Sequence, residues 1–282
     1  GVVMQEDIVT IIGVDCASRL ANVGITKGVY SFTNQRLTIE EVKHASKFEG
    51  LTGKKRLPEL ASIISSWSTP HPTVLALDAP LGWPHLMGER LKDLKAGGEK
   101  LSDIENDDHF FSRYTDRYVR DYVDGHFKHG VNRRINSKPL AIGSDKIAIP
   151  ALGSLQLLSK IRDEGIDVTL GWGENNLDGC RVVEVYPKAT LLSQSIQSER
   201  YKKASDTVRA NIFDRLLECY GNDLSPVAGE IRQKCSEIDH CLDSFICSLT
   251  AIDYLKGRCK GPSSDKAELA YTEGWIWFPH QV

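Results

Sequence analysis

Residues Thr73–Pro84 read T-V-L-A-L-D-A-P-L-G-W-P, an apolar run that ends in an acid and continues into a proline-rich turn. A short apolar run bounded by turn residues predicts a strand that is buried on both faces. Asp78 stands at its carboxyl end, and the following prolines and glycine stop regular structure. A buried acid costs free energy unless it is paired. Two interpretations stay open: Asp78 caps a turn or the next helix, or it is a metal ligand or catalytic carboxylate.

A second aliphatic segment, Ile8–Asp15, also ends in an aspartate. The looser apolar patterns of Leu20–Thr26 and Gly28–Thr33 predict two half-buried strands joined by a hairpin turn at Lys27-Gly28. Three strands are therefore expected in succession, with an acid at the end of the first.

Two helices are expected before the Asp78 strand. Thr38 is a suitable N-cap and is followed by acids, which predicts a helix over Thr38–Lys47. Apolar residues at helical spacing predict a second helix over Leu57–Trp67. Strands and helices in this order indicate a mixed α/β sheet.

The composition is that of an ordinary soluble globular protein. The chain has 282 residues, of which 41% are hydrophobic and 26% charged, and we expect a single domain over residues 1–282. The net charge of -3 gives no overall electrostatic argument for nucleic acid or a membrane. No apolar run is long enough to span a bilayer, and no signal peptide pattern is present.

The cysteines indicate a reducing compartment, so a cytoplasmic location is expected. Their number, seven, is odd, and no C-x-x-C motif occurs. The residues Cys235, His240, Cys241 and Cys247 could be proposed as a zinc cluster, but their spacing matches no usual zinc template.

A helical and loop insertion is expected over about residues 85–180, after the Asp78 strand. Within it, the helix Arg113–Asp121 places Arg113, Arg117 and Arg120 on neighbouring turns. Two interpretations are open for these arginines: a solvated helix face, or a phosphate-binding surface.

Acids recur at similar positions later in the chain. Glu184 lies inside the short apolar segment Arg181–Tyr186, which predicts another buried strand. Asp239–Lys256 is the clearest helix, and Asp239 and Asp243 share one of its faces near the N-terminus. They could simply stabilise the helix dipole.

Clustered acids repel one another unless a cation compensates them. Carboxylates without histidine or cysteine companions suit Mg²⁺ or Mn²⁺. Two such ions can support phosphodiester hydrolysis. The acids concerned are Asp15, Asp78, Glu184, Asp239 and Asp243.

Several strings of the chain resemble the family described as domain of unknown function 429, whose members are described as predicted nucleases with an RNase H fold. The strings are G-V-D-C-A-S (Gly13–Ser18), A-L-D-A-P-L-G-W-P (Ala76–Pro84), R-Y-T-D-R (Arg113–Arg117), V-E-V-Y-P-K-A (Val183–Ala189), D-H-C-L-D-S-F-I-C-S-L-T-A (Asp239–Ala251) and E-G-W-I-W-F-P (Glu273–Pro279). The resemblance thus covers nearly the whole chain. It implies an RNase H-like mixed sheet flanked by helices, interrupted by the insertion before the Glu184 strand.

The resemblance also implies roles for the acids. Asp15 and Asp78 would be metal ligands from the sheet, Asp243 the ligand from the late helix with Asp239 assisting, and Glu184 a further ligand. Glu184 lies on a later strand, where RNase H proper has no catalytic acid. The usual RNase H glutamate would lie on the first helix after the three strands, and the candidates there are Glu40, Glu41 and Glu49.

The R-Y-T-D-R string implies a phosphate clamp made by Arg113, Asp116 and Arg117. The expected function is a Mg²⁺- or Mn²⁺-dependent nuclease acting on DNA or RNA. One alternative is an actin-like or sugar-kinase-like phosphotransferase, but Cys16-Ala17-Ser18 lacks the glycines that its phosphate loop would need. The other is a non-catalytic protein that uses the acidic pocket for binding.

Overall fold

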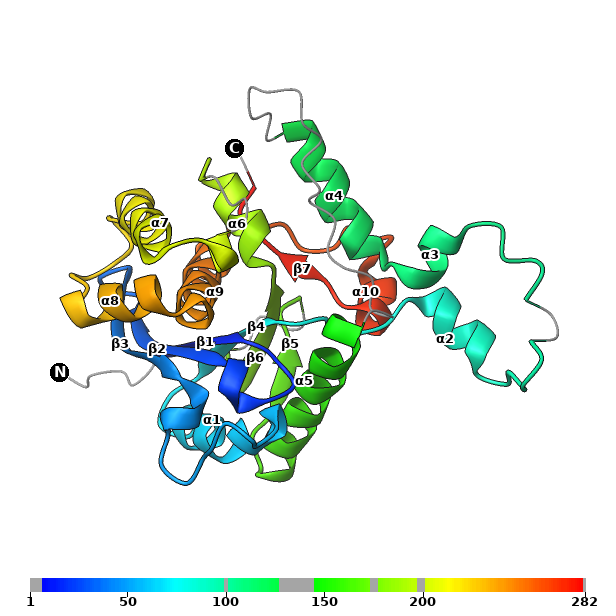
Figure 1. Cartoon of the computed structure of the whole chain (residues 1–282), viewed down its shortest axis with the longest axis horizontal. Helices are drawn as coiled ribbons and strands as arrows, with labels where there is room; N and C mark the ends of the chain where they lie inside the picture. The colour runs from blue at the N-terminus through cyan, green and yellow to red at the C-terminus, as the bar shows by residue number, and fades with distance from the viewer. Residues whose placement is uncertain (1–6, 99–100, 127–144, 173–176, 197–200, 281–282) are drawn as a thin grey trace.

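The computed structural model describes residues 7–98, 101–126, 145–172, 177–196 and 201–280. They form a mixed sheet of seven strands flanked by helices (Figure 1). The strands are β1 (Ile8–Asp15), β2 (Gly24–Ser31), β3 (Arg36–His44), β4 (Thr73–Asp78), β5 (Val168–Leu170), β6 (Cys180–Val185) and β7 (Ile276–Trp277). Their order is β3-β2-β1-β4-β6-β5, and β7 pairs with the end of β6. The α/β class expected from the sequence is confirmed.

Antiparallel and parallel pairing meet at β1. The strands β1, β2 and β3 are antiparallel neighbours, whereas β1–β4, β4–β6, β5–β6 and β6–β7 are parallel. The carboxyl ends of β1, β4 and β6 therefore meet at one edge of the sheet, which is where acids from different strands can converge.

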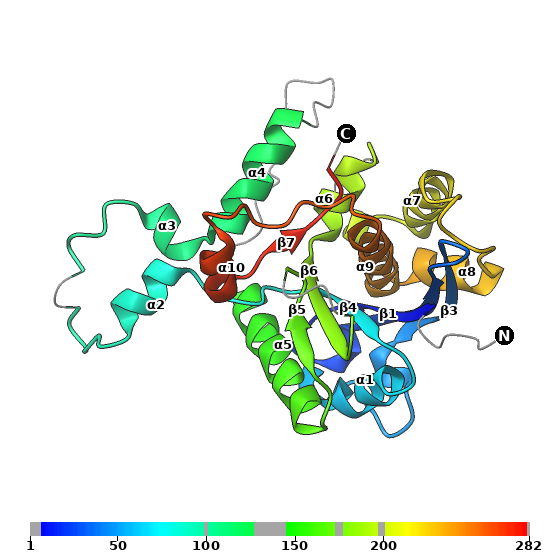
Figure 2. The ribbon, with the colours of Figure 1, turned by 180° about the vertical axis from the view of Figure 1, so that it is seen from behind.

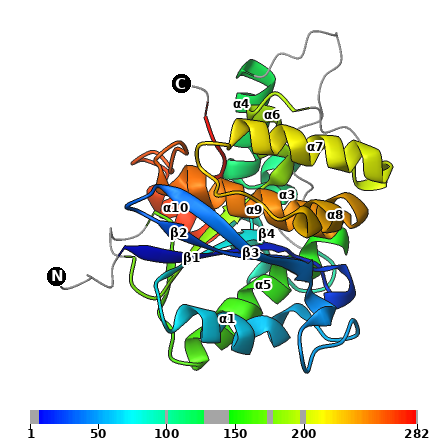
Figure 3. The same ribbon diagram turned by 90° about the vertical axis from the view of Figure 1, so that its left-hand side faces the viewer.

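Helices cover both faces of the sheet (Figure 3). The α-helices are α1 (Ala61–Ser68), α2 (His85–Leu91), α3 (Asp107–Phe111), α4 (Tyr114–His126), α5 (Asp145–Asp163), α6 (Pro187–Ser193), α7 (Asp206–Cys219), α8 (Gly229–Glu237), α9 (Asp239–Leu255) and α10 (Ala267–Glu273). Short 3-10 helices are η1 (Leu20–Asn22), η2 (Ala45–Lys47), η3 (Leu57–Leu60) and η4 (Tyr201–Lys203). Helices α7, α8 and α9 lie on one face, and α1 and α5 lie on the other.

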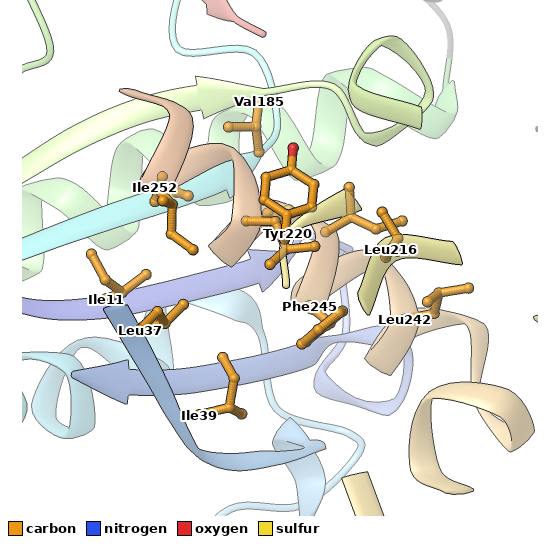
Figure 4. Close-up of a cluster of buried hydrophobic side chains, with 14 of the residues drawn as sticks. Ile11, Leu37, Ile39, Val185, Leu216, Tyr220, Leu242, Phe245 and Ile252 are labelled. Atoms are coloured by element: carbon orange, nitrogen blue, oxygen red, sulfur yellow. The ribbon is translucent and has the colours of Figure 1, made fainter. Parts of the chain in front are cut away.

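Each face of the sheet has its own hydrophobic core, because successive residues of a strand point to opposite sides. Ile11 packs with Phe245 and the other apolar side chains of α9 (Figure 4). The next residue, Ile12, packs with Ile64 of α1 and Leu157 of α5. The strands at the centre of the sheet are buried on both faces, as the aliphatic run before Asp78 predicts.

The prediction of a helix over Thr38–Lys47 is wrong, and so is the hairpin at Lys27-Gly28. Residues Gly24–Ser31 form one strand, with an irregularity of the β2–β3 register at Lys27/Gly28, and Arg36–His44 forms the next. Leu37, Ile39 and Val42 are the buried residues of β3. The alternation of buried and exposed positions outweighs the local helix signals, because it places these side chains against α8 and α9.

The predicted insertion contains α2 to α5 and also β5, which joins the sheet beside β6. Seen from behind, α2 and α3 extend away from the sheet, and α4 lies near α6 (Figure 2). Within the described ranges, no helix combines the length and the apolar character needed to cross a membrane.

Candidate metal centre

Asp15 and Asp78 end two neighbouring parallel strands and are partners in the β1–β4 register. Residues paired in register on adjacent strands project to the same face of a sheet. The two carboxylates therefore lie side by side at the carboxyl edge, on the face covered by α9. The aliphatic runs that precede them fix this placement, because each run is buried on both faces.

Helix α9 approaches β1 and β2 closely enough to bring a third carboxylate to this edge. A Cβ atom on Gly13 would overlap with the Ser244 carbonyl oxygen, and one on Gly24 would overlap with that of His240. The hydroxyls of Thr26 and Ser244 also form a hydrogen bond of 2.8 Å. Glycines on two adjacent strands thus let the helix backbone rest directly on the sheet.

The three carboxylates of Asp15, Asp78 and Asp243 form the carboxylate cluster. One oxygen from each lies within 4.8 Å of the others, and Asp15 and Asp243 are buried while Asp78 is partly buried. Asp15 and Asp78 line a cavity of about 850 Å³. An all-oxygen donor set of this kind fits a hard divalent cation.

Burial and mutual repulsion shape the electrostatics of the cluster. Burial raises the pKa of Asp78 well above its ordinary value, and the Asp15 carboxylate raises it further. Burial also raises the pKa of Asp243 to about 6. A bound cation would favour the charged forms of both groups, so its binding would lower the electrostatic free energy of the cluster.

Two residues of η4 contact Asp243. The Tyr201 hydroxyl donates a hydrogen bond to Oδ1. Oδ2 accepts no well-aligned hydrogen bond but lies 2.7 Å from the Lys202 ammonium. Lys202 is half-exposed and lines the same cavity. The sequence contains no recognisable motif around these two residues, so it gives no signal that they lie beside Asp243.

His240 orients Asp15. Its Nδ1 donates to Asp15 Oδ2 over 2.9 Å, and this bond raises the pKa of His240. The sequence does contain a signal for His240, because this residue lies inside the string D-H-C-L-D, between Asp239 and Asp243. Asp239 itself lies apart from the cluster, partly exposed, with Oδ1 3.6 Å from His240 Nε2.

Glu184, Arg113 and Asp116 form a separate buried network, the Arg113 node. Arg113 Nη1 and Nη2 donate to the two Glu184 oxygens over 2.8 and 2.6 Å, and Nε and Nη2 donate to Asp116 over 3.1 and 2.9 Å. Leu81 N also donates to Glu184 over 3.0 Å. Burial raises the pKa of Glu184, and Arg113 opposes that shift.

Hydrogen bonds of the Arg113 node connect several of the segments whose sequences carry the family resemblance. Arg113 also donates to the Glu273 carbonyl over 2.9 Å. The Glu273 carboxylate accepts from the backbone N–H groups of His85 and Tyr114, over 2.6 and 2.8 Å. The turn after Asp78, the start of α4 and the end of α10 are thus held at one point. Glu184 and Arg113 line the cavity, but their charges are directed at each other.

The remaining candidates lie elsewhere. Arg117 donates to the Ser112 carbonyl over 2.7 Å and is partly buried. Glu40 and Glu41 lie on strand β3 and pair with Lys27 and Lys43, at 3.2 and 2.6 Å. Glu49 is exposed in the turn after η2. None of the three glutamates stands on a helix, because the expected helix is a strand.

The proposed zinc residues do not assemble. Among the described residues, the group found to offer three ligand atoms for a metal is the carboxylate cluster, and it contains none of Cys235, His240, Cys241 and Cys247. Cys235, Cys241 and Cys247 are buried free thiols.

The comparisons with known proteins agree with the family indicated by the strings. The family described as "Protein of unknown function (DUF429)" matches residues 13–268. No curated protein and no solved structure matched the chain. Since the match spans most of the 282 residues, the chain belongs to this family.

Proposed function

We propose that this protein is a divalent-metal-dependent nuclease, built on an RNase H-like fold, that hydrolyses phosphodiester bonds of DNA or RNA. The observation that carries the proposal is the convergence of Asp15, Asp78 and Asp243 within 4.8 Å at the edge of a cavity. Three carboxylates this close repel one another, and a function that requires a cation explains why they are kept together.

The strand arrangement supports the RNase H-like part of the proposal. The chain begins with three antiparallel strands, and β4 then pairs in parallel with β1. One acid ends the first strand, one ends the next central strand, and one lies on a late helix that packs on both. This is the distribution of acids that the family resemblance implies.

The donor set fits Mg²⁺ or Mn²⁺, with Asp15, Asp78 and Asp243 as the residues that would hold the ion. Bound there, such an ion supplies Lewis-acid stabilisation of the phosphate charge and activation of the attacking water. Glu184 and Asp239 would act outside this set, Glu184 through the Arg113 node and Asp239 beside His240.

The residues of the chain hold the ligands in place and balance their charge. His240 fixes the orientation of Asp15, and Tyr201 fixes that of Asp243. The Lys202 ammonium offsets one negative charge and faces the cavity where a phosphate would enter. Glu184 of the Arg113 node accepts a hydrogen bond from Leu81 N, which connects the Pro80–Pro84 turn after β4 to β6.

One observation favours the non-catalytic alternative. Lys202 already pairs with Asp243, so part of the cluster is neutralised without a metal. In that alternative the acidic pocket binds a ligand, and neither Mg²⁺ nor Mn²⁺ enters it. Calorimetric titration with Mn²⁺ separates the two functions, because the nuclease requires binding that depends on Asp78.

The test is Asp78→Asn in a cleavage assay with labelled DNA and RNA strands and Mg²⁺ or Mn²⁺. We expect metal-dependent cleavage to fall by at least about 100-fold, as when one strong stabilising group is removed from an active site. Asp253→Asn is the control, since Asp253 is a buried aspartate of α9 that lies outside the carboxylate cluster and bonds to Tyr220 and Arg258. Cleavage by Asp78→Asn at the wild-type rate would refute the proposal.

A further inference from the structure

The cavity beside the carboxylate cluster has a basic side that the proposed metal chemistry does not explain. Four lysines line it, from α5, α6 and η4: Lys146, Lys188, Lys202 and Lys203. Lys146 and Lys203 are exposed, and within the described ranges neither makes an ion pair. Three elements, of which α5 is distant in sequence from the other two, therefore place lysines around one cavity.

Two of these lysines favour an anionic ligand. Arg113 is not available to it, because its guanidinium is fully engaged by Glu184 and Asp116. Lys146 and Lys203, in contrast, line the cavity and make no ion pair within the described ranges. A divalent ion on the three aspartates of the carboxylate cluster would offset their negative charge, and the phosphates of a strand could then pair with these two lysines.

An aromatic side chain accompanies the lysines. Tyr186 ends the string V-E-V-Y at the carboxyl end of β6, lines the cavity and is only partly buried. A basic groove combined with an aromatic platform is the usual means of binding single strands, because every base can stack on an aromatic face. Stacking requires an unpaired base, which a duplex does not offer.

We infer that the substrate form bound here is single-stranded nucleic acid, with its phosphates on Lys146 and Lys203 and an unpaired base against Tyr186. The inference rests on the proposed nuclease function for the role of the opposite, acidic side. The cavity of about 850 Å³ is within the range of roughly 300–1,000 Å³ that encloses a small ligand, which corresponds to one or two nucleotides of a strand.

The test measures fluorescence anisotropy of a labelled 12-nucleotide single strand, as DNA and as RNA, in EDTA so that the probe is not cleaved. Lys146→Ala/Lys203→Ala should weaken binding of the preferred strand by at least about tenfold. The slope of log affinity against log salt should fall by about 1.4, since each lost phosphate contact on a single strand removes about 0.7. Lys92→Ala/Lys95→Ala is the matched control, because these exposed lysines follow α2 and do not line the cavity.

A second pair of variants tests the aromatic platform. Tyr186→Leu should weaken binding at least about fivefold, and Tyr186→Phe should restore it, because stacking needs the ring and not the hydroxyl. The inference is overturned if both lysine pairs cost the same affinity, if a duplex of the same sequence binds as tightly, or if neither single strand binds. Strand binding in EDTA by a protein that cleaves nothing with Mg²⁺ would refute the nuclease function alone.

Discussion

Two groups of buried acids lie beside one cavity, the carboxylate cluster and the Arg113 node, and they differ in how their charge is balanced. In the node, Nη1 and Nη2 of Arg113 donate hydrogen bonds to Glu184, and Nη2 also donates to Asp116. All three side chains are nearly inaccessible to solvent. In the cluster, Asp243 pairs with the half-exposed Lys202 and Asp15 accepts a hydrogen bond from His240, while Asp78 has no ion pair within the described ranges.

The difference indicates a structural use of the acids in the node and supports the proposed metal-binding use of those in the cluster. The node is complete, because a planar guanidinium matches carboxylates in bidentate geometry. The cluster is incomplete, because Asp78 has no ion pair within the described ranges and the neighbouring Asp15 carboxylate adds to burial in raising the pKa of Asp78. Buried acids alone therefore do not indicate a metal site, whereas buried acids without a matched cation indicate a place where a divalent ion could bind.

Breaking the node should have the largest effect on stability. Arg113→Met leaves Glu184 and Asp116 buried without a cation, and the free energy of unfolding should fall by about 3–5 kcal/mol. Urea denaturation measures it. Arg120→Met is the control, because Arg120 is one-third exposed and pairs with Asp108 and Asp121, so its loss should be below about 1 kcal/mol.

The triple variant Arg113→Met/Asp116→Asn/Glu184→Gln should recover part of that stability, since no buried charge is then left uncompensated. If Arg113→Met leaves stability unchanged while abolishing strand binding, the node would instead be a phosphate clamp, as the R-Y-T-D-R string implied.

Much of the cluster could be predicted from the sequence, because its parts have strong local signals. The aliphatic runs before Asp15 and Asp78 are short, which predicts buried strands, and parallel pairing then brings their ends together. Helix α9 has an apolar stripe with Asp243 beside it. The position of each carboxylate therefore follows from the strand or helix that contains it.

The node and the lysine contact could not be predicted, because they depend on which distant segments meet. Glu184 looks like a metal ligand until Arg113, 71 residues earlier, is found beside it. Lys202 reaches Asp243 from a 3-10 helix with no motif. Strand β3 was missed for the opposite reason: Thr38 and the acids after it give a local helix signal that packing against α8 and α9 overrides.

The pH dependence of stability should further distinguish the carboxylate cluster from other buried acids. The pKa of Asp243 rises from 3.8 unfolded to about 6 folded, so between these values the folded state binds more protons. Stability of the metal-free protein should therefore be highest toward pH 4–5 and fall as the pH rises through about 6. Asp243 contributes up to about 3 kcal/mol to this fall, at about 1.4 kcal/mol per pKa unit.

Mg²⁺ should remove that part of the fall, because it binds the ionised carboxylates. Thermal denaturation at pH 5 and 7.5, with and without Mg²⁺, measures it, and Asp243→Asn should make the two metal conditions alike. Asp253 also has its pKa raised to about 6, away from the cluster, so its contribution should not respond to Mg²⁺. A wild-type pH profile that Mg²⁺ leaves unchanged would mean that the cluster is not a cation site.

The smallest effect concerns Lys202, the lysine that pairs with Asp243 of the cluster. Its ammonium lies 2.7 Å from Asp243 Oδ2 and competes with a metal for that oxygen. Lys202→Met should therefore raise Mn²⁺ affinity by about fivefold, close to 1 kcal/mol, which is the scale of a half-exposed ion pair. Calorimetric titration measures it against Lys203→Met, which removes the same charge from the neighbouring residue and should change the affinity less than about twofold. Unchanged or weaker binding in Lys202→Met would mean that lysine and metal do not compete, and the cluster would then resemble the Arg113 node, with its charge balanced from within.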